Sequence, residues 1–264
     1  MHRRGSLLVI GLVLTAVWAT NAQRLTVSGT EILCNGSRIW LNAANTPWNN
    51  WNDFGGSYNS SWWDAEFAQI KAAGGNATRI WINCNGDCAI SIGSDGTVSG
   101  ASSKHWSDLD DLFALARQHE IYVMATLISF DHTTSPNTNY LSWRAMYNSD
   151  AAVSSFVDNY VTPFVNRYKS NPYLAMVEPC NEIEWVHETP ERGDIAWSRL
   201  QYYLARVAAA VHEHSDVLVT QGCSVKWQSD IAPACEGNFF SDANLRAQYD
   251  NTGAYLDIYS PHWY

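Results

Sequence analysis

The segment 177–185 reads VEPCNEIEW and carries three glutamates within seven positions, directly after an apolar run. A carboxyl group at the end of a buried strand is well placed to act as a general acid or base. Glu182 follows an asparagine and is the candidate acid. Glu178 lies inside the apolar run, and we expect Glu184 to face the following loop. Hydrolysis by carboxyl groups usually needs a pair of them, so the rest of the chain must supply a second.

The elements that position this segment follow a repeating pattern. Short apolar runs alternate with helical patterns, which is typical of βα units and a parallel sheet. The runs lie at 39–44, 78–82, 121–128, 173–177, 217–220 and 256–259, and the helices are predicted at about 61–73, 107–118, 149–169, 197–213 and 241–249. Ser107 is the predicted N-cap of the second helix, and Pro163 should kink the third. Residues 25–41 alternate apolar and polar types around Asn35-Gly36, which predicts an N-terminal β-hairpin.

These patterns indicate the α/β class and one domain over residues 23–264. An eight-stranded (β/α)8 TIM barrel takes about 250 residues, and six runs use nearly all of this chain. We therefore expect an incomplete barrel with about six of eight βα units. A doubly wound sheet is the alternative, but it usually has a glycine-rich turn after its first strand, and the sequence NAANTPWNN is not such a turn.

Polar residues stand at the end of every predicted strand. In chain order they are Asn42 and Asn45, Arg79 and Asn83, Asp131 and His132, Asn181 and Glu182, Gln221, and finally His262 and Tyr264. The carboxyl ends of barrel strands meet at one mouth, where active sites are built. We expect these side chains to form one site.

Composition narrows the function. The chain is 46% hydrophobic and 16% charged, enough to form a core, and its net charge of −10 disfavours nucleic acid as a partner. Thirteen tryptophans and thirteen tyrosines favour flat surfaces that stack on a ligand such as a sugar. A phosphate-binding loop, a GxSxG esterase motif and a CxxC pair are all absent from the sequence. We therefore expect neither a metal nor a cofactor.

The N-terminus resembles a secretory signal. Arg3 and Arg4 precede an apolar run at 7–17, and Thr20 and Ala22 have the spacing that a signal peptidase reads. We expect residues 1–22 to be removed and a secreted, extracellular protein without a membrane segment. In an oxidising compartment the cysteines are expected to form disulfides, and the pair in CNGDC could close a small loop. The cysteines are Cys34, Cys84, Cys88, Cys180, Cys223 and Cys235.

Several segments together resemble glycoside hydrolase family 5, in the clan of retaining (β/α)8 glycosidases. They are RIW on the second predicted strand, DH after the third, NE after the fourth and HWY after the sixth, supported by NTPWNNWNDFGG, HWSDLDDLF and YSPHWY. The similarity spans most of residues 25–264. Within the family, the chain most resembles secreted endo-β-mannanases and cellulases. The resemblance implies a monomeric hydrolase of β-1,4-linked polysaccharide, with mannan favoured over cellulose.

The resemblance also implies a role for each matching residue. Glu182 would be the general acid/base, and Asn181 would hydrogen-bond the sugar 2-hydroxyl. Arg79 would keep the nucleophile ionised, since a nearby cation lowers the pKa of a carboxylate. The remaining residues are expected to contact substrate: His132 and His262 by lining the cleft, Tyr264 near the nucleophile, and Trp48 and Trp185 by stacking.

The sequence departs from the family pattern at two places. Ile183 replaces the proline that usually follows the Asn-Glu pair, which affects the loop more than the chemistry. The nucleophile of the family comes from the end of a seventh strand, so we expect it beyond residue 264. Three alternatives stay open: a cellulase, a non-catalytic glycan-binding homologue, and a secreted barrel with another hydrolytic chemistry.

Overall fold

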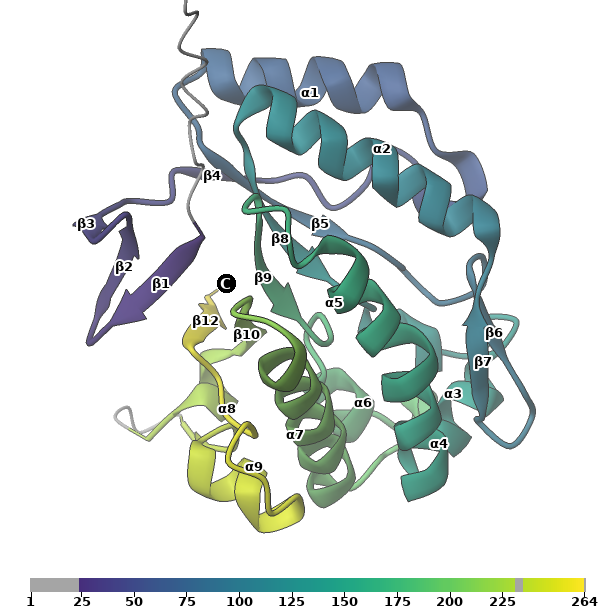
Figure 1. Cartoon of the computed structure of the whole chain (residues 1–264). Coiled ribbons are helices and arrows are strands. Elements are labelled where there is room, and N and C mark those ends of the chain that lie inside the picture. Colours follow the sequence, from purple (N-terminus) through teal and green to yellow (C-terminus); the bar gives the residue numbers. More distant parts are fainter. Residues whose placement is uncertain (1–23, 231–234, 264) are drawn as a thin grey trace, which may run out of the picture.

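The computed structural model describes residues 24–230 and 235–263, and its centre is a curled sheet of six strands (Figure 1). The strand order is β12-β10-β9-β8-β5-β4, and each neighbouring pair is parallel. The strands are β4 (Ala43–Asn45), β5 (Ala77–Trp81), β8 (Tyr122–Thr126), β9 (Leu174–Glu178), β10 (Leu218–Ser224) and β12 (Ile258–His262). All six predicted strands are confirmed. Among the described residues the edge strands β4 and β12 do not pair, so the sheet is an incomplete barrel.

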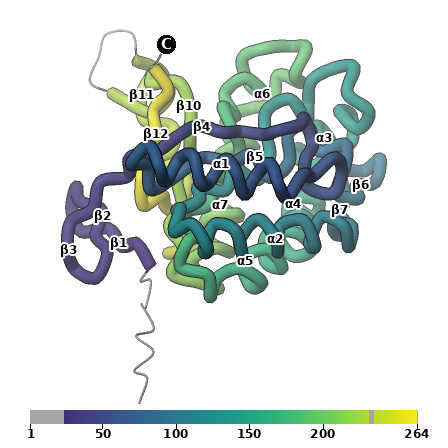
Figure 2. Tube along the Cα trace, turned by 90° about the horizontal axis from the view of Figure 1, so that it is seen from above, coloured from purple at the N-terminus to yellow at the C-terminus, as the bar shows by residue number. Residues whose placement is uncertain are grey.

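Helices cover the outer face of the sheet. The long ones are α1 (Ser60–Ala72), α2 (Ser103–His119) and α7 (Trp197–His214), and the shorter ones are α3 (Tyr140–Tyr147), α4 (Asp150–Phe156), α5 (Thr162–Tyr168), α6 (Glu184–Glu188), α8 (Val225–Gln228) and α9 (Asp242–Gln248). Figure 2 shows α1 and α2 side by side outside β5, and the two helices are in contact. Their buried faces and the strands form one hydrophobic core. No described helix is long and apolar enough to cross a membrane.

The N-terminal hairpin is confirmed, with one more strand than expected. β1 (Leu25–Ser28), β2 (Glu31–Cys34) and β3 (Ser37–Arg38) form an antiparallel sheet, and Asn35 and Gly36 make the second turn with φ of 56° and 71°. Cys34 Sγ lies 3.4 Å from the hydroxyl of Tyr122, at the amino end of β8. The small sheet therefore lies at the end of the barrel opposite the predicted site. The predicted signal segment 1–22 lies outside the described residues.

The structure bears on two predictions about helices, the kink at Pro163 and the N-cap at Ser107. The helix predicted at 149–169 is divided before Pro163: a π-helical turn at Val157–Val161 separates α4 from α5, and Thr162 N donates to Val157 O. Proline has no N–H to continue the regular ladder. The predicted N-cap Ser107 is wrong, because α2 begins four residues earlier and Ser102 Oγ accepts from His105 N at 3.2 Å. The sequence analysis also missed α3 and a hairpin, β6 (Ile90–Ile92) with β7 (Val98–Ala101).

The structure does not show the expected disulfides among the described residues, and they stay a prediction. Within the described part of the chain, Cys84, Cys88, Cys180, Cys223 and Cys235 have free thiols. Cys84 and Cys88, the pair closest in sequence, differ in environment: Cys84 is buried, whereas Cys88 is exposed beside Gly56. Cys180 and Cys223 are buried in the core, where burial holds the pKa of both thiols well above the usual value. Packing therefore uses these residues as small apolar side chains.

The start of α2 can be tested with two serines on one helix. Ser102→Ala removes the cap and should lower the free energy of unfolding by about 1 kcal/mol. Ser107→Ala changes an exposed position inside the helix and should shift it by less than about 0.5 kcal/mol. Urea unfolding of both variants measures the difference. Equal losses would show that the helix does not begin at Ser103.

Candidate active site

The carboxyl ends of the strands surround a cleft of about 640 Å³. Five of the predicted polar strand-end residues line it: Asn45, Arg79, Asn181, Glu182 and His262. The other lining residues are Ala43, Ala44, Trp81, Met124, Phe130 and Trp263. The convergence of polar strand ends on one mouth is therefore confirmed for β4, β5, β9 and β12.

Glu182 lies just beyond β9 with an unusual backbone. Its φ is 48°, a left-handed conformation that costs energy for a residue with a Cβ. Its N–H donates to Gly222 O at 3.0 Å, which ties this backbone to β10. The side chain is largely buried, and Oε1 lies 2.8 Å from His262 Nδ1. The carboxyl group is thus fixed in the cleft by contacts from two neighbouring strands.

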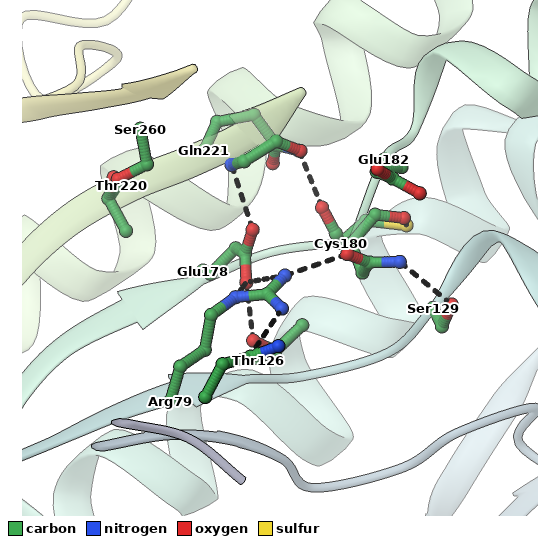
Figure 3. A network of polar contacts seen from close by, with 12 residues as sticks. Arg79, Thr126, Ser129, Glu178, Cys180, Glu182, Thr220, Gln221 and Ser260 are labelled. Carbon is green, nitrogen blue, oxygen red and sulfur yellow. Dashed lines mark hydrogen bonds and ion pairs between the residues drawn. The ribbon is translucent and has the colours of Figure 1, made fainter. Parts of the chain in front are cut away.

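Arg79 pairs with Glu178 inside the barrel (Figure 3). Its Nη2 and Nε lie 2.7 and 2.9 Å from Glu178 Oε2, and Nη2 also donates to Asn181 Oδ1 at 2.7 Å. The carboxyl partner that the described residues give to Arg79 is therefore Glu178. The nucleophile that the sequence analysis expected beside Arg79 is not among these contacts.

Glu178 is completely buried and fully engaged. Besides Arg79, it accepts hydrogen bonds from the Thr126 hydroxyl and from Gly222 N, the latter at 2.8 Å. Gly222 has to be glycine here, because a Cβ would lie 2.2 Å from Glu178 Oε1 and 2.6 Å from His262 Nε2. A carboxylate with all these donors is poorly suited to attack a substrate. Glu178 is a structural residue beneath the cleft.

The prediction that His132 lines the cleft is wrong. His132 is completely buried and bonds Ser129 O through Nδ1. The rings of Trp143 and Tyr147 pack against it at 5.3 and 5.5 Å. Burial lowers the pKa of His132 to about 4, so the ring is neutral near pH 7. The short 3-10 turn at Phe130–Thr133 directs this side chain into the core instead of the mouth.

Glu184 also differs from its expected place. It does not face the loop but is buried, and Oε1 accepts from Ser224 N at 2.7 Å. Burial raises the pKa of Glu184 to about 6. Because this carboxyl group does not line the cleft, it is not a candidate acid.

Trp48 and Trp185, which were predicted to contact substrate, do not line the cleft but pack against rings that do. Trp48 packs on Trp81 with ring centroids 4.9 Å apart, and Trp81 is the lining residue. Trp185 is 37% exposed and lies 6.1 Å from the ring of Phe130, which lines the cleft. Tyr264 lies outside the described residues.

The sequence analysis missed Trp81, Met124, Phe130 and Trp263 as lining residues. Trp81 and Trp263 were part of the quoted RIW and HWY segments, so a signal for them was present. Trp263 is 80% exposed, an unusual exposure for so large an apolar ring.

Comparisons with known proteins agree with the sequence resemblance. No protein-family model matches the chain. A mannan endo-1,4-beta-mannosidase of Cryptopygus antarcticus is 30% identical over 183 residues, which are 66% of this chain and 46% of the relative. The enzyme of that name from Mytilus edulis is 29% identical over 165 residues, 61% of this chain and 44% of the relative. The chain thus spans about half the length of the curated relatives it matches.

Solved structures show the same fold. The beta-mannanase of Mytilus edulis superposes with a TM-score of 0.81 at 24% identity, over 92% of this chain and 75% of that one. The endo-1,4-beta-mannanase of Eisenia fetida gives 0.78 at 23% identity, over 90% and 72%. The barrel fold is therefore confirmed, and the chain resembles proteins named mannan endo-1,4-beta-mannosidase.

The contribution of the buried ion pair Arg79–Glu178 to stability can be compared with that of the exposed pair Arg38–Glu31. Glu178→Gln keeps the shape of the side chain but leaves the Arg79 guanidinium, whose side chain is 13% exposed, without its carboxylate. We expect the free energy of unfolding to fall by about 3 kcal/mol. Glu31→Gln breaks the Arg38–Glu31 pair, whose side chains are 52% and 46% exposed, and should cost less than about 1 kcal/mol. Urea unfolding measures both losses, and similar values would contradict a structural role for Glu178.

Proposed function

We propose that this chain belongs to a retaining glycoside hydrolase of family 5 that cleaves β-1,4-linked mannan within the polymer chain. One observation carries the proposal. Glu182 follows Asn181 at the carboxyl end of β9 and lines the cleft beside His262, in a fold shared with mannanases. The relatives named mannan endo-1,4-beta-mannosidase support mannan as the substrate.

In this proposal Glu182 is the general acid and base. It protonates the leaving glycosidic oxygen, and it then removes a proton from the water that completes hydrolysis. Two contacts keep the Glu182 carboxyl group in one place: its side chain contacts His262, and the backbone N–H of Glu182 donates to Gly222 O. Such positioning is needed because proton transfer requires hydrogen-bond distance to the reacting oxygen. Asn181 is proposed to donate to the sugar 2-hydroxyl.

The nucleophile must be a second carboxylate about 5–5.5 Å from the acid. Among the described residues that line the cleft, Glu182 is the one carboxylate. Glu178 is excluded by its burial and its bonds to Arg79, Thr126 and Gly222. The family resemblance assigns the nucleophile to the end of a seventh strand, and the six strands of the sheet do not include that strand.

Aromatic rings supply surfaces for sugar stacking. Trp81 lines the cleft from β5, backed by Trp48 and Trp51, and Trp263 lines it from the other edge of the sheet. Stacking alone does not distinguish mannose from glucose, which differ in the direction of the 2-hydroxyl. A cellulase is therefore the second candidate, and assays on soluble mannan and carboxymethylcellulose separate the two.

The role of Glu182 is tested by Glu182→Gln in the natural protein. We expect release of reducing sugar from mannan to fall by about 10²–10⁴-fold while mannan binding persists. Substrates with an activated aryl leaving group, which need little protonation, should lose much less. Glu184→Gln is the control, since it changes a buried carboxyl group two residues away and should leave turnover nearly unchanged.

Two outcomes would contradict the assignment. A loss below about tenfold on mannan would remove Glu182 as the acid. Binding of mannan without turnover by the unchanged protein would instead favour a non-catalytic glycan-binding homologue.

We further propose that the protein is exported and acts as a monomer. Export is supported by Arg3 and Arg4 before the apolar run 7–17, with Ala22 at the end of the signal. N-terminal sequencing of the mature protein should begin at Gln23, and size exclusion should give the mass of one chain. Retention of Met1 in the exported product would contradict the signal.

A further inference from the structure

Asn181, the proposed partner of the sugar 2-hydroxyl, is held from both sides. Arg79 Nη2 donates to its Oδ1 at 2.7 Å, and its Nδ2 donates to Ser129 Oγ at 3.2 Å. Ser129 Oγ in turn donates to Asp131 Oδ2 at 2.7 Å. The contacts form one chain that runs from the ion pair with Glu178 to Asp131.

Arg79 and Asp131 are the two ends of this chain of hydrogen bonds, and their chemistry sets which group donates in each bond between them. A guanidinium has donors but no acceptor, so Asn181 must present its oxygen to Arg79. An ionised carboxylate accepts only, so Ser129 must give its single hydrogen to Asp131. The Ser129 oxygen is then left to accept, and the group facing it must be the Asn181 NH₂. Both ends therefore impose the same orientation on the amide.

Backbone hydrogen bonds leave the Asn181 side chain little freedom to move. Asn181 N donates to Ile128 O at 2.8 Å, and Phe130 N donates to Asn181 O at 3.2 Å. Ser129 is completely buried, and Asn181 is 3% exposed. One Nδ2 hydrogen is used by Ser129. The other has no hydrogen bond to a described residue, and Asn181 lines the cleft.

Asp131 is partly buried, and its surroundings bear on its charge. Burial raises the pKa of Asp131, and the charge of Glu182 raises it further. The hydrogen bond from Ser129 and the charge of Arg192 act in the opposite direction. Arg192 is itself stacked 4.6 Å above the ring of Phe130, so its charge is kept near this turn.

We propose that Ser129 and Asp131 are positioning residues that hold the Asn181 amide with one N–H presented to a sugar hydroxyl in the cleft. The inference rests on the proposed glycoside hydrolase function for its ligand, while the orientation of the amide can be tested without any ligand. Asp131 acts through Ser129, and Ser129 acts through Asn181.

The first experiment measures the amide itself. In nitrogen-15 labelled protein, the two side-chain protons of Asn181 give separate signals, and the one bonded to Ser129 should exchange slowly with water. Ser129→Ala and Asp131→Ala should shift both signals and speed exchange at least about fivefold, as loss of a typical hydrogen bond implies. Asp131→Asn keeps an oxygen that accepts from Ser129 and should restore most of the protection.

Two further variants separate positioning from general damage. Thr133→Val removes a hydroxyl from the same 3-10 turn, where Thr133 Oγ1 bonds Phe130 O and not Asn181, and should leave the Asn181 signals unchanged. The double variant of Ser129→Ala with Asp131→Ala should be no worse than Ser129→Ala alone, because Asp131 acts through the hydroxyl. Unchanged Asn181 signals in Ser129→Ala, or additive effects in the double variant, would overturn the proposal.

The second experiment measures the ligand in the natural protein. Binding of mannotriose is compared with binding of its analogue that lacks the 2-hydroxyl on the sugar in the cleft. The preference for mannotriose should fall about fivefold in Ser129→Ala and stay in Thr133→Val. An unchanged preference in Ser129→Ala would overturn the proposal. If the unchanged protein binds neither sugar, the proposed function fails, and the Asn181 signals decide the positioning roles separately.

Discussion

The buried charge of Glu178 is the constraint on which the rest of the site depends. A completely buried carboxylate is costly unless it is paired and hydrogen-bonded. Its partners are Arg79 on β5, Thr126 on β8 and Gly222 on β10, and Glu178 itself ends β9. One carboxylate thus links its own strand, β9, to the three strands β5, β8 and β10. A change in the register of any one of these neighbouring strands would remove one of the bonds that hold this charge.

The position of Glu182 follows from the same contacts. Four residues after Glu178, its backbone turns into a left-handed conformation and its N–H is held by Gly222 O. Gly222 therefore bonds both glutamates. Its carbonyl oxygen accepts from the backbone N–H of Glu182, and its N–H donates to the side chain of Glu178. The lack of a side chain at Gly222 also admits His262, which contacts Glu182. The strained backbone of Glu182 persists because β10 over-determines it.

Sequence reasoning could predict the site as far as strand periodicity reaches. Arg79, Asn181, Glu182 and His262 meet because parallel strands bring their carboxyl ends to one mouth. The same rule failed for His132, since the direction of a side chain after the strand end depends on the following turn. It also could not pair Glu178 with Arg79, which lies 99 positions away in the chain and is brought close by the barrel alone.

The predicted start of α2 was wrong for a related reason. Ser107 and Ser102 are both possible caps, and the choice depends on which serine has an extended backbone before the first turn. The disulfide pairing could not be predicted, because an oxidising compartment allows cysteines to pair but does not bring them together. The fold places Cys84 and Cys88 in different environments despite a separation of four positions.

Arg79 can bond both Glu178 and Asn181 because its guanidinium has several donors in a fixed plane. Nε and Nη2 are used by Glu178 and Asn181, which neutralises the buried charge and orients the amide. Nη1 makes one long contact of 3.5 Å, to Asn45 Oδ1, and Arg79 lines the cleft. The guanidinium therefore retains donor capacity toward the cleft after satisfying Glu178. The structural pair and the expected role of Arg79 beside a nucleophile are compatible, because they use different nitrogens of the same group.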